Sequence, residues 1–348
     1  MSSNKFIQDG EAQVKEAEKS LKTGLMKWSQ DFDVAAGCYT KAATSFKNAK
    51  EYARSLDCSM KAADCHLKNK VPFQAAKSLE QAAFCARDLG DFKKVVELIN
   101  RAYLLYVENG VQDTAGTLLD RGAKILEDPL PQEASNLYRK AGDLAQIQDK
   151  NSQASEMFDK SARLLVKMDK YDEAAKVLEE LIKNELASPS PPARRFVLCL
   201  VLVHLKRDDY VAARKAYETG LRFPDPLNSG QLDLARSLLD SYDHSDREAL
   251  KQVTSNAFVR SLDPVYARLA RSLDVADGGL GAVSAAPVAV ARPSPPQQQQ
   301  QPAFIPQEAL PQPAPVVASE TPSPADDNQS ASNTEFHVTS EDNEDDLT

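Results

Sequence analysis

The chain has 348 residues, of which 42% are hydrophobic and 27% are charged, and its formal net charge is −9. The negative charge belongs to residues 276–348, which hold eleven acids and one base, whereas the rest of the chain holds 40 acids and 41 bases. A nearly neutral body argues against nucleic acid as a partner, although it allows local basic patches.

The first predicted element is a helix over residues 4–22, with an apolar stripe on one face. The residues at its start lack the apolar core of a secretory signal. A short segment follows that holds the only tryptophan of the chain: Leu25, Met26, Lys27 and Trp28. This segment is predicted either to pack the first helix onto the second or to touch a membrane, because tryptophan favours the bilayer interface and lysine favours anionic headgroups.

Between residues 31 and 186 the sequence repeats about every 20 residues. Each repeat places small or apolar residues at a start position and at offsets of four and seven, which lie on one face of a helix. The start residues are Ala35, Ser55, Ala75, Val95, Ala115, Ala134, Ala154 and Ala174. Breaks rich in Gly, Pro, Asn or Asp separate the repeats, and Asp31 offers an N-cap to the first.

This pattern predicts an all-α fold, a tetratricopeptide-like solenoid in which helical hairpins of about 40 residues form a twisted sheet of antiparallel helices. The repeat is longer than the tetratricopeptide standard, whose tryptophan-containing signature is absent. A stacked repeat of this kind builds a binding surface rather than a catalytic pocket. The five cysteines form no CxxC pair and are predicted to be reduced, buried side chains of a cytosolic protein: Cys38, Cys58, Cys65, Cys85 and Cys199.

After Leu186 a Ser/Pro-rich linker interrupts the repeat. The apolar helix predicted over Phe196–Leu205 is about half as long as a membrane span. The repeat pattern resumes over 209–219, and further helices are predicted over 231–241, 246–256 and 264–273. The following stretch, with eleven of the 20 prolines and a glutamine run, is predicted to be disordered. The predicted domains are a repeat solenoid over 1–186, a C-terminal helical bundle over 187–275 and a disordered acidic tail over 276–348.

A column of basic residues stands at offset six, at the edge of the packed face. Since alternate helices of a solenoid face opposite ways, Lys41, Arg121 and Lys160 are predicted on one face. The other face is predicted to hold Lys61, Arg101 and Lys140. Two interpretations are open: the stems of these side chains cover apolar surface, or their charges line the inner surface of the solenoid for an acidic helical partner.

We find no pattern of residues that predicts an enzyme, a metal site or a cofactor site. The adjacent Cys65 and His66 point about 100° apart on a helix, and no metal-ligand spacing or phosphate loop occurs. The acidic end from Glu341 onward is either a solubilising tail or a docking motif with one apolar anchor, Leu347.

Several strings resemble the soluble NSF attachment protein (SNAP) family, and its gamma type in particular. They are residues 17–28, 42–50, 106–115, 161–167, 171–175 and 201–213, and the resemblance spans about residues 5–273. It implies an adaptor that binds SNARE complexes (syntaxin-type) on membranes and recruits the hexameric ATPase NSF, which pulls these complexes apart. The alternative is a static helical-repeat scaffold in a trafficking complex without ATPase coupling.

The resemblance also implies site residues. Membrane contact, peripheral and weak, is expected at Leu25–Trp28. SNARE binding is expected on the basic inner face, where Lys160 takes a matching basic position and repeat geometry adds Arg121 and Lys41. The ATPase-engaging residues are expected at the acidic end: Glu344, Asp345, Asp346 and Leu347. A cytoplasmic protein peripherally associated with membranes is therefore expected.

Overall fold

The computed structural model describes residues 2–23, 29–189, 193–224 and 230–275, which form fifteen α-helices and no strand. The predicted all-α class is confirmed. Two predicted sites lie outside the described residues: the segment Leu25–Trp28 and the acidic end Glu344–Leu347.

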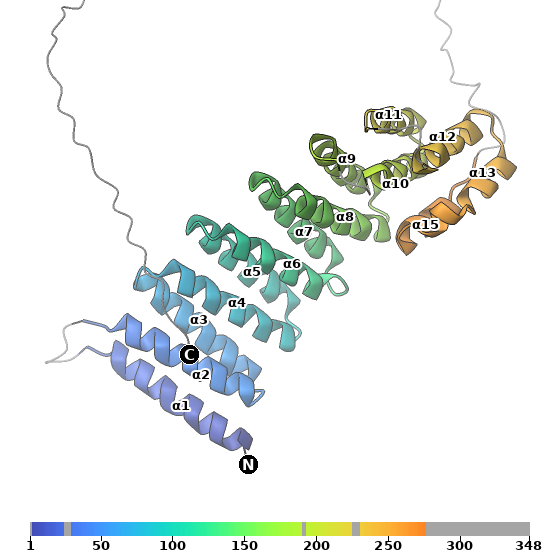
Figure 1. Ribbon diagram of the computed structural model, residues 1–348. Coiled ribbons are helices and arrows are strands. Elements are labelled where there is room, and N and C mark those ends of the chain that lie inside the picture. The colour runs from blue at the N-terminus through green and yellow to red at the C-terminus, as the bar shows by residue number, and fades with distance from the viewer. Residues whose placement is uncertain (1, 24–28, 190–192, 225–229, 276–348) are drawn as a thin grey trace, which may run out of the picture. The chain divides into compact units, whose positions relative to one another are not determined.

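Nine helices follow one another over residues 2–187 (Figure 1). The first, α1, covers Ser2–Leu21, and the next eight correspond to the eight predicted repeats. These are α2 Phe32–Asn48, α3 Tyr52–Lys68, α4 Pro72–Asp88, α5 Phe92–Glu108, α6 Gln112–Leu126, α7 Pro131–Ile147, α8 Asn151–Lys167 and α9 Tyr171–Ala187. Each packs against its neighbours in sequence, as antiparallel hairpins do.

The small residues of the repeat form the contacts between these helices. All eight start residues have no exposed surface, and the residues at offsets four and seven are buried as well. A small residue lets two helix backbones approach, while the larger residue at offset four fills the space between them. At Gly142 of α7 the approach is so close that a Cβ atom would lie 2.6 Å from the ring of Phe158.

All the turns between the repeats except the one between α6 and α7 share one geometry that keeps the 20-residue period. Asp31 accepts a hydrogen bond from the backbone N–H of Val34, which confirms the predicted N-cap. Six of the turns end on a residue with positive φ, and only two of these are glycine: Lys50, Lys70, Gly90, Gly110, Asp149 and Asp169. The N–H of the next residue then returns to a carbonyl in the last turn of the helix, as from Glu51 to Phe46.

Side chains about 40 positions apart touch, so helices two apart in the chain lie side by side. Lys140 of α7 donates to Asn100 of α5 at 2.6 Å, and Lys160 of α8 donates to Asp120 of α6 at 2.9 Å. The even-numbered helices α2–α8 therefore form one layer and the odd-numbered helices α3–α9 another (Figure 1). This confirms the predicted hairpin repeat.

Six shorter helices complete the described part of the chain: α10 Ala193–Lys206, α11 Tyr210–Gly220, α12 Gly230–Asp243, α13 Arg247–Thr254, α14 Ala257–Arg260 and α15 Pro264–Arg271. Every residue of α10 from Phe196 to Leu205 is buried, because α9, α11, α12 and α15 surround this helix. One apolar core runs from α8 and α9 through to α15. The division at residue 187 therefore stays a prediction.

The short helix α14 was not predicted. Four residues carry no hydrophobic period, and its start is fixed by Asn256, which accepts a hydrogen bond from the N–H of Phe258. The five cysteines are free and buried, as predicted. Among the described helices, none combines the length and the apolar character that a membrane crossing requires.

Candidate partner-binding surface

Three predicted binding residues lie on even-numbered helices: Lys41 on α2, Arg121 on α6 and Lys160 on α8. Lys41 is exposed and has no ion-pair partner among the residues that the structure describes. The side chain of Arg121 is 51% exposed, although its guanidinium contacts Glu80 of α4 at 2.6 Å. Both residues therefore present positive charge to solvent from the same layer.

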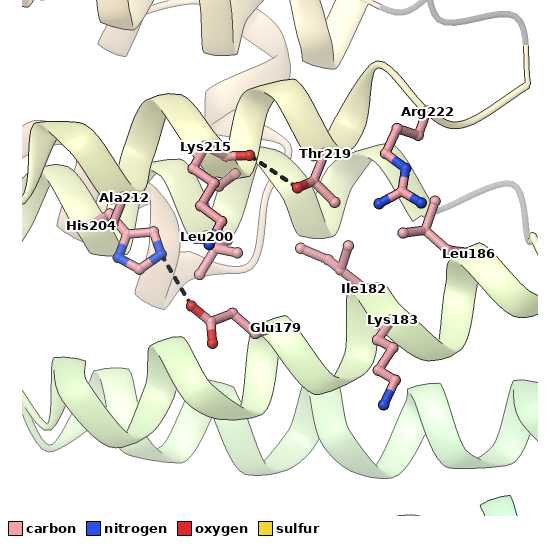
Figure 2. A pocket seen from close by; sticks show the side chains of 11 residues that line it. Glu179, Ile182, Lys183, Leu186, Leu200, His204, Ala212, Lys215, Thr219 and Arg222 are labelled. Carbon is pink, nitrogen blue, oxygen red and sulfur yellow. Dashed lines mark hydrogen bonds and ion pairs between the residues drawn. The ribbon is translucent and has the colours of Figure 1, made fainter.

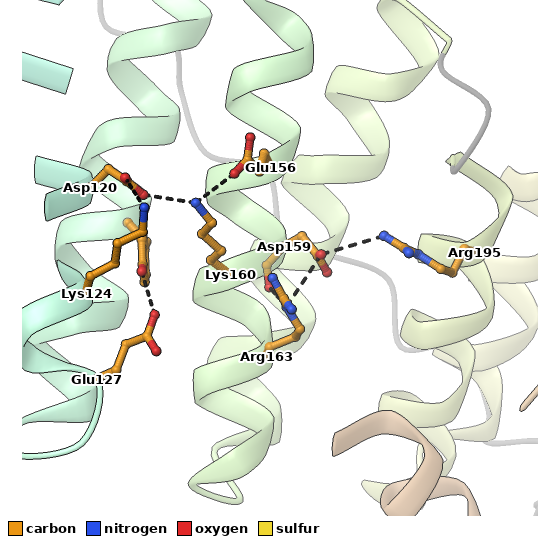
Figure 3. Close-up of polar contacts among 9 residues, drawn as sticks. Asp120, Lys124, Glu127, Glu156, Asp159, Lys160, Arg163 and Arg195 are labelled. Carbon is orange, nitrogen blue, oxygen red and sulfur yellow. Dashed lines mark hydrogen bonds and ion pairs between the residues drawn. The ribbon is translucent and has the colours of Figure 1, made fainter. Parts of the chain in front are cut away.

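Lys160 is held much more tightly (Figure 3). Its side chain is 17% exposed, and its Nζ lies 2.9 Å from Asp120 and 2.7 Å from Glu156. It also stands 5.4 Å above the ring of Tyr138. Burial alone lowers the pKa of Lys160, but the hydrogen bonds to Glu156 and Asp120 outweigh burial and raise it. The lysine is charged, and its charge is largely balanced by acids of its own fold.

These contacts follow a rule that relates helices two apart. Offsets are counted from the start residue of each repeat. A residue at offset five of one helix pairs with the residue at offset six of the helix two positions later in the chain. Examples are Glu80 with Arg121, Asn100 with Lys140, and Asp120 with Lys160. Arg139 and Glu180 obey the same rule with the charges exchanged, at 3.5 Å. Three of the six cations of the basic column, Arg121, Lys140 and Lys160, thus join neighbouring helices of one layer.

The cations at offset six were recognised in the sequence, whereas their partners at offset five were not. The signal was present, because an acid or amide occurs at offset five of five helices: Glu80, Asn100, Asp120, Asp159 and Glu179. The rule also explains why Lys41 has no ion-pair partner within the described ranges of the chain. It lies on the first repeat, so no repeat helix two positions earlier can supply an acid at offset five. Lys41 and Arg121 are therefore better placed than Lys160 to meet a carboxylate from outside, and their role in binding stays a prediction.

A second group of charges joins α8 to α10 and α15. Asp159 lies 3.5 Å from Arg163 and 3.7 Å from Arg195 (Figure 3). Arg163 also contacts Asp263 at 3.0 Å, and Asp263 caps α15 by accepting from the N–H of Val265. Burial raises the pKa of Asp159 in spite of the two arginines. This group fixes the C-terminal helices against α8 rather than offering charge to a partner.

The Lys160 contacts predict how acid affects stability. Burial raises the pKa of Asp120, but hydrogen bonds from Lys124 and Lys160 outweigh it, so the net shift is below the ordinary value of 3.8. A lowered carboxyl pKa stabilises the fold above the unfolded-state pKa, and this contribution disappears as the pH falls through the folded-state pKa.

Asp120→Asn is therefore expected to lower the melting temperature at neutral pH and to lessen the fall of the melting temperature below about pH 4. Thermal unfolding followed by circular dichroism across this range measures both. A melting curve with unchanged acid dependence would contradict the assignment.

Comparison with known proteins gives a consistent set of relatives. A family model described as soluble NSF attachment protein, SNAP, matches residues 8–258. The gamma-soluble NSF attachment protein of Dictyostelium discoideum is 29% identical over 283 residues, which are 80% of this chain and 86% of that protein. The protein of the same name from Arabidopsis thaliana is 28% identical over 270 residues, 77% of this chain and 93% of that protein. The beta-soluble NSF attachment protein of Bos taurus is 24% identical over 250 residues, which are 70% of this chain and 83% of that protein.

Proposed function

The chain belongs to the soluble NSF attachment protein family, and on that premise we propose that it binds SNARE complexes on membranes and recruits NSF to disassemble them. The family consists of attachment proteins, so the prediction that the chain is an NSF adaptor rather than an enzyme is confirmed. The ATP hydrolysis is then supplied by NSF, in vesicle fusion and intracellular protein transport.

The observation that carries the SNARE part of the proposal is the pair of available cations in one helix layer. Lys41 has no ion-pair partner within the described residues, and Arg121 is half-exposed with donors to spare beyond Glu80. An acidic helical bundle laid along this layer would meet both charges, which favours its approach and its orientation. Lys160 contributes mainly by keeping α6 and α8 together.

The roles proposed for the two ends of the adaptor are inferred from the sequence alone. Leu25–Trp28 would touch the membrane weakly, and Glu344–Leu347 would engage NSF. Both segments lie outside the described residues. A cytoplasmic protein that is peripherally bound to membranes fits this arrangement, since a single loop with one tryptophan gives only weak membrane affinity.

A disassembly assay tests the proposal. Purified chain, NSF and a fluorescently labelled SNARE complex are mixed with ATP or with a non-hydrolysable analogue. We expect the SNARE proteins to separate only with ATP and only when the chain is present. Binding without ATP-dependent release would instead support a static scaffold in a trafficking complex.

Reversing the two available charges is expected to weaken SNARE binding. The double variant Lys41→Glu with Arg121→Glu should lower the affinity at least about tenfold near physiological salt, because attraction becomes repulsion at two points. The matched control is Lys61→Glu with Lys140→Glu, which makes the same change at the same offset in the other layer. Surface plasmon resonance at several salt concentrations measures both variants. Equal losses of SNARE affinity in the two variants would contradict the proposal that SNARE complexes bind the even-numbered layer.

A further inference from the structure

A groove lies between the odd-numbered helices α9 and α11, and Figure 2 shows the side chains that line it. Its volume is about 380 Å³. Its apolar lining includes Ile182 of α9, Leu200 of α10 and Ala216 of α11, all of them buried. The groove is therefore separate from the even-numbered helices that carry Lys41 and Arg121.

The groove occurs where the pairing rule between helices two apart fails. Asp209 caps α11, and the start residue four positions later is Ala213. Offset five of α9 is Glu179, but offset six of α11 is Thr219 rather than a cation. The hydroxyl of Thr219 instead donates to the carbonyl of Lys215 at 2.9 Å. Within the described ranges no ion pair of this type joins α9 to α11, and the acid at offset five has no lysine or arginine partner.

The lining of the groove carries more positive than negative charge. Lys183, Lys215 and Arg222 are exposed, and within the described part of the chain none of them has an ion-pair partner. Glu179 is the one acid among the described lining residues, and it stands 3.7 Å from Nε2 of His204. Burial lowers the pKa of His204, so this ring adds no positive charge at neutral pH. The groove therefore attracts anions.

Two of these cations point into the groove from the same side. Figure 2 shows Lys215 and Arg222 directed toward α9, one on each side of Thr219, and Ile182 lies between them in this view. Seven positions separate the two cations, which corresponds to about 10 Å along a helix. The matching ligand has two carboxylates at this spacing and an apolar side chain between them.

We propose that this groove binds an acidic segment of a second protein, with its carboxylates at Lys215 and Arg222 and an apolar side chain against Ile182. In a helical segment the two acids stand at positions i and i+7, and the apolar residue stands at i+3 or i+4. The segment supplies between α9 and α11 the acid–base contacts that the chain itself supplies between earlier helices. The proposal does not depend on the function proposed above. If both hold, the adaptor binds this second partner and a SNARE complex at different layers.

A designed peptide tests the groove. The probe is a fluorescent peptide, held helical by a staple, with glutamates at its third and tenth positions and leucines at its sixth and seventh. The full-length chain should bind it at least about tenfold more tightly than a control peptide with glutamines in place of the two glutamates. Fluorescence anisotropy measures both. Equal binding of the two peptides would overturn the proposal. The assay contains neither SNARE proteins nor NSF, so its outcome is independent of the disassembly assay.

Charge reversal in the groove is expected to remove this binding. Lys215→Glu with Arg222→Glu should weaken binding of the acidic probe at least about tenfold. The matched control is Lys77→Glu with Lys93→Glu, at two exposed lysines outside the groove that likewise have no ion-pair partner among the described residues. Equal losses in the two variants would contradict the assignment. Circular dichroism checks that both variants fold, and Lys215→Gln with Arg222→Gln repeats the test with a milder change.

Photocrosslinking locates the bound probe. With benzoylphenylalanine at its sixth position, the probe is expected to join residues of α9, α10 or α11, which mass spectrometry identifies. Crosslinks confined to other helices would overturn the proposal. Vesicles of phosphatidylserine and phosphatidylcholine test the alternative that the groove meets a membrane. If reversing the charges of Lys215 and Arg222 abolished vesicle binding but left probe binding unchanged, the groove would belong to a membrane contact instead.

Discussion

Replacing Phe158 by alanine is expected to lower the free energy of unfolding by about 3–5 kcal/mol. The ring has no exposed surface and lies in the core shared by α8 and its neighbours. It lies opposite Gly142, which has no side chain to fill the vacancy. Urea unfolding followed by circular dichroism measures the loss.

The matched control is Ile147→Ala, at the end of the neighbouring helix α7. Ile147 is 73% exposed, so its truncation should change the free energy of unfolding by no more than about 0.5 kcal/mol. Gly142→Ala should be destabilising alone, because its Cβ would collide with the ring, and harmless or favourable once the ring is gone. A double-mutant cycle that found the two changes additive would contradict the close contact.

Removing residues 341–348 is expected to abolish ATP-dependent SNARE disassembly. The deletion takes away five acids and Leu347, the segment that we propose engages NSF, and leaves all described residues intact. Disassembly should fall at least about tenfold, while SNARE binding without NSF should stay unchanged, because Lys41 and Arg121 are untouched. The fluorescence disassembly assay measures the first and surface plasmon resonance the second.

A deletion of comparable size elsewhere in the tail is the control for this effect. Removing the glutamine run 297–301 shortens the tail without changing its charge. It should leave disassembly within about twofold of the unmodified chain, because tether length alters effective concentration only gradually. If both deletions reduced disassembly equally, the acidic end would have no special role. Leu347→Ser then separates the contribution of the leucine from that of the charges.

The repeat helices could be predicted because burial has a fixed period in them. Residues such as Ala75, Leu79 and Ala82 of α4 point to one face, and short polar turns separate one helix from the next. Five of the six described C-terminal helices lie within a few residues of the predicted ranges, and α14 was missed because its four residues carry no hydrophobic period. The prediction of α10 rested on an unbroken apolar run, since every residue from Phe196 to Leu205 is buried and the pattern has no period to read.

The candidate site could be predicted only in part. The basic column is visible in the sequence, since the repeat aligns Lys41, Arg121 and Lys160. Which of these cations is already paired depends on residues about 40 positions earlier, such as Asp120 before Lys160. That pairing requires the relative placement of helices two apart, which the period of a single helix does not contain.

The two-layer arrangement limits how a protein of this design can change its length. If α5 and α6 were both removed, α8 would stand two helices after α4, and Glu80 would meet Lys160 as a new acid–base pair under the same offset rule. If α5 alone were removed, every later helix would change layer relative to α2. Lys41 and Arg121 would then face opposite ways, and the binding surface would be divided. Helices in such a chain should therefore be gained or lost in even numbers. An even number keeps every later helix in its layer and leaves the binding surface whole.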